Sequence, residues 1–317
     1  MSRAGSWSRK LPAEDPFITA VGGTDLSTTG PGGNWVSETA WNNPCSNQYG
    51  ECASGGGISP DSVPIPSWQG GVANSSNGGS ATLRNVPDVA AEANTDNYYC
   101  DMGSCTGTNG TGASGGTSYA APRWAGFLAL VNQQAVASGI VSPGGGIGFI
   151  NPFIYEIGLS SNYDSNFHDI NSGNNDCCGQ SRWFDAVNGY DLVTGWGSPN
   201  GQTLINSLTT SETTQLNNFS FTEQYDPTFS VTVLDANGQL VTGGSVTFSF
   251  CSLYGGGCTT ICSAQVTGTG QTSCQNPVNN QSGQEYTLTA TYSGFRRYQG
   301  SSTLETVIGL GYAFSPQ

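Results

Sequence analysis

The sequence has little charge and almost no histidine. Of its 317 residues, 8 are Lys or Arg, 22 are Asp or Glu and one is histidine, so the net charge is −14. A chain with so few cations lacks the basic clusters that bind a nucleic-acid backbone or an anionic membrane surface. The single histidine, His168, excludes most histidine-based metal sites and permits a Ser-His-Asp triad only if His168 is part of it. Nucleic acid and lipid are therefore not expected partners.

Long hydrophobic runs are also missing. The longest strongly apolar run, residues 124–131, is far shorter than the ~20 residues that span a bilayer, so no transmembrane helix is expected. Residues 1–10 contain basic side chains but no apolar core, so they are not a signal peptide. A surface of Ser, Thr, Asn and Gly stays polar when carboxylates protonate, and this composition favours an acidic working environment.

Cysteine is present, but never as a Cys-x-x-Cys pair. Six cysteines precede residue 210 and four follow it, and even groups at short spacings favour disulfides over zinc. We therefore predict an oxidising, extracellular setting, with two disulfides of open connectivity among the last four cysteines. Asn-x-Ser/Thr sequons fit surface loops but are common by chance, and they begin here at Asn74, Asn109, Asn218 and Asn280.

The chain divides into two parts of different composition and periodicity. Residues 11–210 are rich in Gly, Ser and Asn, with short apolar strands and one helix pattern at 122–136, which predicts an α/β domain. Residues 211–317 alternate with period 2, as expected for an all-β sandwich. Asn-Gly between the alternating runs 229–234 and 245–250 predicts a hairpin. Residues 1–10 belong to neither part.

Ser118 is the candidate nucleophile. Gly115 and Gly116 precede it closely and allow a tight turn and close approach of a substrate, and Pro122 is tolerated in a first helical turn. The Ser118 hydroxyl would then lie at a helix N-terminus, where free N–H groups and the helix dipole favour a developing oxyanion. The alternative is a serine that caps the helix.

The pattern Gly-Thr-Ser-x-x-x-Pro before an apolar helix resembles the nucleophile segment of the subtilisin-like fold. His168 lies in Asn-Phe-His-Asp-Ile, a context unlike that of a triad histidine. The chain is therefore more similar to the sedolisin family, the serine-carboxyl peptidases, in which carboxylates replace the histidine. Residues 12–24, 84–89 and 149–152 resemble further segments of that family.

This resemblance implies a secreted serine-type endopeptidase that hydrolyses proteins at acidic pH through an acyl-enzyme on Ser118. A protein or peptide substrate would add as a strand to the glycine-rich segment formed by Ser54, Gly55, Gly56 and Gly57, although a simple glycine turn is the alternative. In the family the glutamate base, its orienting aspartate and an oxyanion aspartate all precede the stretch that matches Pro12. We therefore expect that the N-terminal half of the subtilisin-like domain is missing and that this chain alone is inactive.

Three other carboxylates carry weaker signals. Glu92 and Asp96 are spaced like two carboxylates on one helix face, but no apolar helical period surrounds them. They are not assigned as the catalytic base. Asp88, in the segment ahead of the nucleophile loop, is expected to be structural.

Two aspartates form a candidate calcium site. Ca²⁺ takes six to eight oxygens from carboxylates, backbone carbonyls and water. By resemblance to the sedolisins, one Ca²⁺ is held by the carboxylates of Asp169 and Asp191 and the carbonyls of Ile170, Val187 and Gly189. The family usually has glycine at the position of Val187, and valine keeps the carbonyl while restricting the loop. The alternative is that both aspartates are solvated and cap turns.

Residues 211–317 resemble bacterial Ig-like modules, most clearly at 231–238 and 290–294. A surface or a polymer is the kind of ligand such a module would bind, although the alternation itself specifies none. An alternative function for the whole chain follows. It would be a non-catalytic extracellular binding or scaffold protein, built from a degenerate peptidase half and an Ig-like module.

Overall fold

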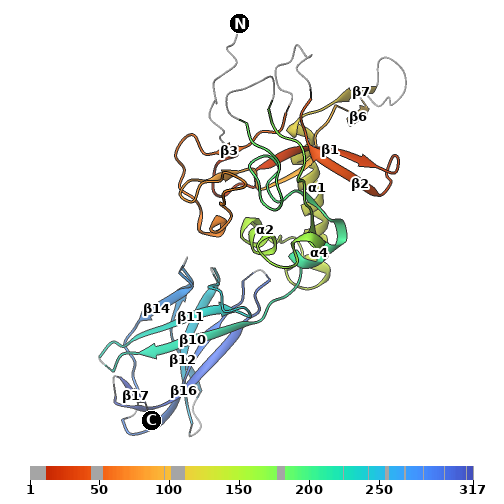
Figure 1. Ribbon diagram of the computed structural model, residues 1–317. Helices are drawn as coiled ribbons and strands as arrows, with labels where there is room; N and C mark the ends of the chain where they lie inside the picture. Colours follow the sequence, from red (N-terminus) through yellow and green to blue (C-terminus); the bar gives the residue numbers. More distant parts are fainter. Residues whose placement is uncertain are drawn as a thin grey trace. The chain divides into compact units, whose positions relative to one another are not determined.

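The computed structural model divides the chain into two compact units, Met1–Ser138 with Ser142–Leu208, and Gly139–Val141 with Thr209–Gln317 (Figure 1). The residues it describes are 12–43, 53–95, 97–100, 111–176, 183–223, 225–241, 243–253, 257–267, 269–280, 282–295, 297–311 and 313–316. The expectation of a separate N-terminus at 1–10 and of disulfides among the cysteines before residue 210 lies outside the described residues and side chains.

A three-stranded sheet is central to the first unit. Its strands are β1 (Val21–Thr28), β2 (Trp35–Ala40) and β5 (Val89–Glu92), in the order β2-β1-β5. β1 pairs in parallel with β5 and antiparallel with β2. Helix α1 (Thr117–Ala137) packs against β1 and β5 (Figure 1). All four residues of β5 are buried, and its sequence is apolar up to Glu92, as expected for a strand that is covered on both faces.

Shorter elements complete this unit. Three pairs of short strands are antiparallel: β3 (Gly57–Ile58) with β4 (Asn85–Val86), β6 (Asn97–Cys100) with β7 (Thr111–Ser114), and β8 (Phe167–His168) with β9 (Ser198–Pro199). The remaining helices are η1 (Ser67–Gln69), α2 (Asn151–Gly158), α3 (Tyr163–Asn166) and α4 (Gly201–Leu208).

A buried ion pair joins several of these elements. Arg84 and Asp88 are both fully buried, and the guanidinium donates to both carboxylate oxygens, from Nη1 to Oδ1 at 2.8 Å and from Nη2 to Oδ2 at 2.6 Å. The Arg84 guanidinium also lies over the ring of Trp68, 4.9 Å from its centroid. Burial lowers the pKa of Arg84, but the Asp88 carboxylate outweighs burial and the net pKa is raised. The guanidinium therefore stays charged inside the unit.

The remaining acceptor capacity of Asp88 is used by three donors from two other segments. Its Oδ2 accepts from the backbone N–H of Ala20 at 2.7 Å and from Nδ2 of Asn151 at 3.2 Å, and its Oδ1 accepts from the Tyr155 hydroxyl at 2.8 Å. Asn151 and Tyr155 both belong to α2. The prediction that Asp88 is structural therefore agrees with these contacts.

The second unit contains two antiparallel sheets. One has the order β10-β11-β14 and the other the order β13-β12-β15-β16-β17. The strands are β10 (Thr214–Phe221), β11 (Thr228–Asp235), β12 (Ser245–Ser252), β13 (Cys258–Gln265), β14 (Gln271–Gln275), β15 (Glu285–Tyr292), β16 (Ser301–Gly309) and β17 (Phe314–Pro316). Alternate residues of both sheets, such as Val231, Phe248 and Leu288, share one apolar core.

The predicted hairpin between 229–234 and 245–250 is wrong. The turn itself forms, with the N–H of Gly238 donating to the Asp235 carbonyl at 3.1 Å and a φ of +78° at Gly238. The chain then returns only briefly, where Leu240 bridges Leu234. β12 begins later and lies in the other sheet. The period-2 pattern specified two strands with buried faces, but it could not specify that they belong to different sheets.

The two disulfides predicted among the last four cysteines are present. They join Cys251 to Cys258 and Cys262 to Cys274. The first links directly paired residues of β12 and β13, and the second links β13 to β14 in the other sheet. The second bridge therefore connects the two sheets covalently.

Candidate active site and carboxylate loop

The turn before Ser118 depends on two glycines. The N–H of Gly116 donates to the carbonyl of Ala93, at the end of β5, at 2.6 Å. A Cβ at Gly115 would lie 2.7 Å from that carbonyl oxygen. Gly116 has φ +122° and ψ +159°, a conformation that is essentially restricted to glycine. The glycines therefore bring the chain against β5 and turn it into α1.

Ser118 lies in the first turn of α1 with its side chain exposed. None of the described residues hydrogen bonds to its hydroxyl. The N-cap position is occupied by Gly116, and no side chain caps the helix, so the alternative of a capping serine does not describe this structure. Ser118 thus lies in the helical turn whose backbone N–H groups lack intrahelical partners.

The helix begins earlier than the sequence pattern indicated. We expected it at 122–136, with Pro122 in the first turn, and the structure has Thr117–Ala137, with Pro122 in its second turn. Proline has no N–H, so it cannot donate to the carbonyl of Ser118, four residues earlier. The apolar period begins at the proline, whereas the backbone geometry begins at the glycine turn.

The glycine-rich segment has mixed exposure. Ser54 is buried, and its hydroxyl donates to the carbonyl of Val193 at 2.7 Å and accepts from the N–H of Gly23 at 2.9 Å. A Cβ at Gly56 would overlap the carbonyl of Leu192. Gly57 has φ +125° and pairs with β4, while Gly55 is exposed with open space beside it. Of this segment, only Gly57 lies in a strand, at the start of the two-residue β3.

Asp191 is fully buried in a tight loop. One carboxylate oxygen, Oδ1, accepts from the N–H groups of Val193 at 2.8 Å and Thr194 at 2.7 Å. The other, Oδ2, accepts from the N–H of Val187 at 3.1 Å, and the Thr194 hydroxyl reaches both oxygens. Burial raises the pKa of Asp191 to about 7, although these hydrogen bonds oppose the shift.

Asp169 contacts the same loop. Both of its oxygens accept from the N–H of Gly189 at 3.2 Å, and Oδ1 also accepts from the Tyr163 hydroxyl at 2.9 Å. Burial raises the pKa of Asp169, opposed by these two donors. Among the five predicted ligands, Asp169 thus contacts Gly189 and Asp191 contacts Val187, through the backbone N–H groups and not through the carbonyls predicted as ligands. Ile170 is buried beside Asp169. We call residues 186–195 the carboxylate loop.

The carboxylates at this loop are oxygen ligands that fit a hard cation. Within the described part of the chain, the three arginines bind elsewhere: Arg84 at Asp88, Arg123 at Asn97 and Arg297 at Glu212. The two half-buried or buried carboxylates therefore have only neutral donors, and a buried carboxylate without a cation is costly. Oxygen ligands of this kind suit Ca²⁺.

Sequence reasoning missed two residues of this region. The Tyr163 hydroxyl bridges Asp169 to the carbonyl of Trp196, and burial together with Asp169 raises the pKa of Tyr163. Thr194 contacts both oxygens of Asp191. Thr194 follows Asp191 by three residues in a Gly-rich stretch. This spacing could have predicted that its hydroxyl hydrogen bonds to the carboxylate. Tyr163 has no such signal, because it lies at the start of α3 and Asp169 follows only after β8.

The remaining titratable candidates do not contact Ser118 within the described residues. Glu92 lies in β5 and accepts from the backbone N–H groups of Leu26 and Asn94, while Asp96 lies outside the described residues. His168 stacks on Trp35 with ring centroids 4.3 Å apart. Burial lowers the pKa of His168, and Glu38 opposes this shift. The histidine is thus held by an aromatic contact.

Comparison with known proteins agrees with this geometry. Residues 2–143 match the model of the Subtilase family. The first unit is therefore similar to a subtilisin-like α/β peptidase domain. Kumamolisin of Bacillus sp. (strain MN-32) is 34% identical over 206 residues, which are 64% of this chain and 33% of that protein. Sedolisin of Pseudomonas sp. (strain 101) is 32% identical over 203 residues, 61% of this chain and 29% of that protein.

A mammalian relative also matches about two thirds of this chain. Tripeptidyl-peptidase 1 of Canis lupus familiaris is 29% identical over 231 residues, 65% of this chain and 36% of that protein. The resemblance to the sedolisin family that the motifs predicted is thus confirmed. The chain spans about a third of the length of these curated relatives. Among the described residues, no helix combines the length and the apolar character needed to cross a membrane.

The turn before Ser118 yields a direct prediction. Gly116→Ala should lower the free energy of unfolding by about 1–3 kcal/mol, because alanine at this φ and ψ is strained. Gly126→Ala is the matched control in the same helix, where a Cβ would meet no atom within 4 Å. It should raise stability by about 0.5–1 kcal/mol. Urea unfolding of both variants measures this, and equal changes would contradict the assigned backbone geometry.

Proposed function

We propose that the first unit is the nucleophile-bearing part of a serine-carboxyl endopeptidase of sedolisin type. The observation that carries the proposal is the exposed Ser118 hydroxyl in the first turn of α1, behind a turn that only glycine can make. The relatives named above support the same class. The substrates are proteins or peptides, which would lie in extended form along the segment from Gly55 to Gly57.

The chemistry follows from the position of Ser118. A carboxylate base removes the hydroxyl proton as Oγ attacks the peptide carbonyl, and the first-turn N–H groups stabilise the oxyanion. The amine leaves with a proton, and water then releases the acyl group. A carboxylate has a pKa far below that of histidine, so it remains a base at acidic pH. Acidic pH is therefore the proposed working range.

The base is not among the described residues that contact Ser118. Glu92, the nearest candidate along the sequence, already accepts two backbone N–H groups. A serine without a positioned base is a weak nucleophile. We therefore propose that the 317-residue chain alone hydrolyses peptides poorly.

Replacing the nucleophile tests this function. In the full-length gene product, Ser118→Ala should abolish cleavage of an unfolded protein at acidic pH, lowering kcat by about 10⁴-fold or more because Oγ forms the covalent bond. Ser138→Ala, at the C-terminal end of the same helix, is the control and should keep full activity. Undiminished turnover by Ser118→Ala would end the assignment. Release of internal fragments distinguishes an endopeptidase from an enzyme that releases tripeptides.

We further propose that the carboxylate loop holds one Ca²⁺ through Asp169, Asp191 and the carbonyls of Ile170, Val187 and Gly189. The support is the placement of both carboxylates against the same loop, without a cationic partner in the described part of the chain. A bound Ca²⁺ would replace neutral N–H donors by a full charge. It would thereby remove the cost of ionising the buried Asp191.

Calcium should stabilise the wild-type protein in a pH-dependent way. Without the ion, burial raises the pKa of Asp191 from 3.8 to about 7. The folded carboxyl therefore binds a proton that the unfolded chain has released, and metal-free stability falls as the pH rises from about 4 to 7. Ca²⁺ binds the ionised carboxylate, so the calcium-induced rise in Tm should be larger at pH 7 than at pH 4.

Two variants complete the calcium experiment. Asp191→Ala should abolish the calcium-induced rise in Tm, whereas Asp164→Ala, which removes an exposed aspartate of α3, should keep it. An equal calcium-induced rise in Tm in the wild type and in Asp191→Ala would contradict the proposed calcium site. A rise that does not depend on pH would also contradict it.

The second unit is proposed to be an extracellular Ig-like module. Its two antiparallel sheets, shared core and disulfides support that proposal, and a surface or polymer is the class of ligand we propose for it. The lack of a described base at Ser118 favours one alternative function, a non-catalytic binding or scaffold protein. Cleavage by the full-length gene product decides between the two.

A further inference from the structure

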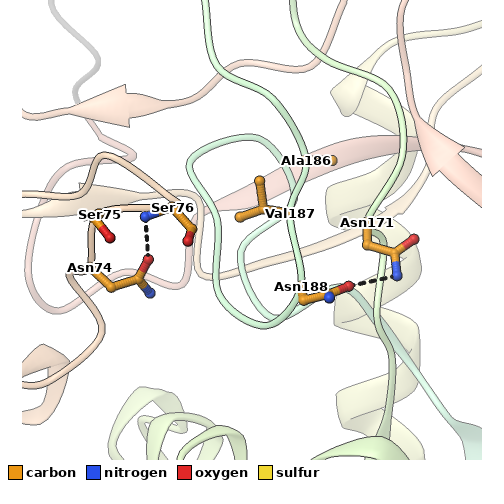
Figure 2. Close-up of a pocket in the computed structure, with 7 residues that line it drawn as sticks. All are labelled: Asn74, Ser75, Ser76, Asn171, Ala186, Val187 and Asn188. Atoms are coloured by element: carbon orange, nitrogen blue, oxygen red, sulfur yellow. Dashed lines mark hydrogen bonds between the residues drawn. The ribbon is translucent and has the colours of Figure 1, made fainter.

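An open pocket of about 520 Å³ lies beside the carboxylate loop (Figure 2). Asn74, Ser75 and Ser76 form one wall, and Asn171, Val187 and Asn188 lie across from them. None of its lining residues is charged. The volume is in the range of small-molecule sites, ~300–1,000 Å³. The pocket therefore suits a neutral ligand with many hydroxyl or amide groups.

The far wall has unused hydrogen-bonding capacity. Nδ2 of Asn171 donates to Oδ1 of Asn188 at 2.9 Å (Figure 2). Each amide has a donor and an acceptor, so this contact leaves Nδ2 of Asn188 as a donor and Oδ1 of Asn171 as an acceptor, unpaired within the described chain. Both side chains are exposed. A sugar ring presents alternating donors and acceptors that match such a pair.

The near wall contains the sequon Asn74-Ser75-Ser76. Asn74 is exposed, and its Oδ1 accepts from the N–H groups of Ser76 at 2.8 Å and Asn77 at 3.0 Å, which fixes the side chain in the turn. Its Nδ2 has only a long contact, 3.4 Å, to the carbonyl of Val72. The nitrogen that would be modified is therefore accessible while the oxygen orients it.

The structure separates this sequon from two others. Asn280 is buried, and its Nδ2 donates to the carbonyl of Ala313 at 2.8 Å while its Oδ1 accepts from Gly311 at 2.7 Å. Such an amide is part of the fold and is unavailable. Asn218 is exposed at a bulge of β10, but it does not line this pocket. The sequon at Asn109 lies outside the described residues.

We propose that Asn74 carries an N-linked glycan whose first sugars lie in this pocket and join the turn at Asn74 to the carboxylate loop. In the modification, Nδ2 of Asn74 attacks C1 of a lipid-linked oligosaccharide. The bond from C1 to the lipid pyrophosphate breaks, the pyrophosphate leaves with the electron pair, and Nδ2 loses a proton. This inference rests on the extracellular location proposed above and is independent of peptidase activity.

The modification is tested by secreting the 317-residue chain from a eukaryotic host, with a second sequon appended at the C-terminus to report that the transferase acted. Peptide mass mapping should find a glycan on Asn74. Asn74→Gln and Ser76→Ala should both lose it. Ser75→Ala is the matched control, since it alters the same wall but keeps the sequon, and it should retain the glycan. An unmodified Asn74 beside a modified appended sequon would overturn the proposal.

Hydrogen exchange tests where the glycan lies. Amides of residues 186–189 should exchange about two- to tenfold more slowly in the glycosylated wild type than in Asn74→Gln and Ser76→Ala, as new hydrogen bonds to the wall would produce. Asn188→Ala should keep the glycan mass and lose this protection. A glycan on Asn74 that leaves exchange at 186–189 unchanged would contradict its placement in the pocket.

Discussion

The buried ion pair between Arg84 and Asp88 is the constraint on which the first unit depends. Two charges without contact to water are tolerated only when every lone pair is used, and here the carboxylate accepts from the guanidinium, from Ala20 and from two side chains of α2. The backbone of the same two residues extends the network. The carbonyl of Arg84 accepts from Ser59, and the carbonyl of Asp88 accepts from Trp196.

This network explains how the parts of the site come together. Ser59 follows the glycine-rich segment, Trp196 follows the carboxylate loop, and Asp88 leads directly into β5, whose end receives the turn before Ser118. Glycine makes the close approaches possible, because a Cβ at Gly195 would overlap the backbone of Asp88 and one at Gly56 would overlap Leu192. The high glycine content, 46 residues, thus includes positions where two backbones touch.

Local patterns predicted the local parts of this structure. Alternation placed strands at β11, β12 and β15, and the Gly-Gly-Thr-Ser segment placed Ser118 at a helix start. Strand partners could not be predicted, since β11 pairs with strands of one sheet and β12 with strands of the other. The start of α1 was also misplaced, because a turn set by glycine φ and ψ has no apolar period.

The candidate site was predicted in part, for a related reason. Asp169 and Asp191 were found through motifs, whereas Tyr163 was missed because its contact with Asp169 depends on the packing of α3 against β8. The catalytic base stays unassigned. The Arg84–Asp88 pair itself was visible only as two charged residues four apart, a spacing that also describes an exposed helix pair.

We infer that this pair holds three segments of the site to one another. Native-state hydrogen exchange on Asp88→Asn tests it most directly, with Asp164→Asn as an exposed control. We expect the amides of Ser59, Gly116 and Trp196 to lose protection together in Asp88→Asn. The amides of Ser59 and Trp196 donate to the carbonyls of Arg84 and Asp88, and that of Gly116 donates to Ala93, at the end of the strand that follows Asp88. Loss of protection confined to one of these amides, or equal loss in Asp164→Asn, would contradict it.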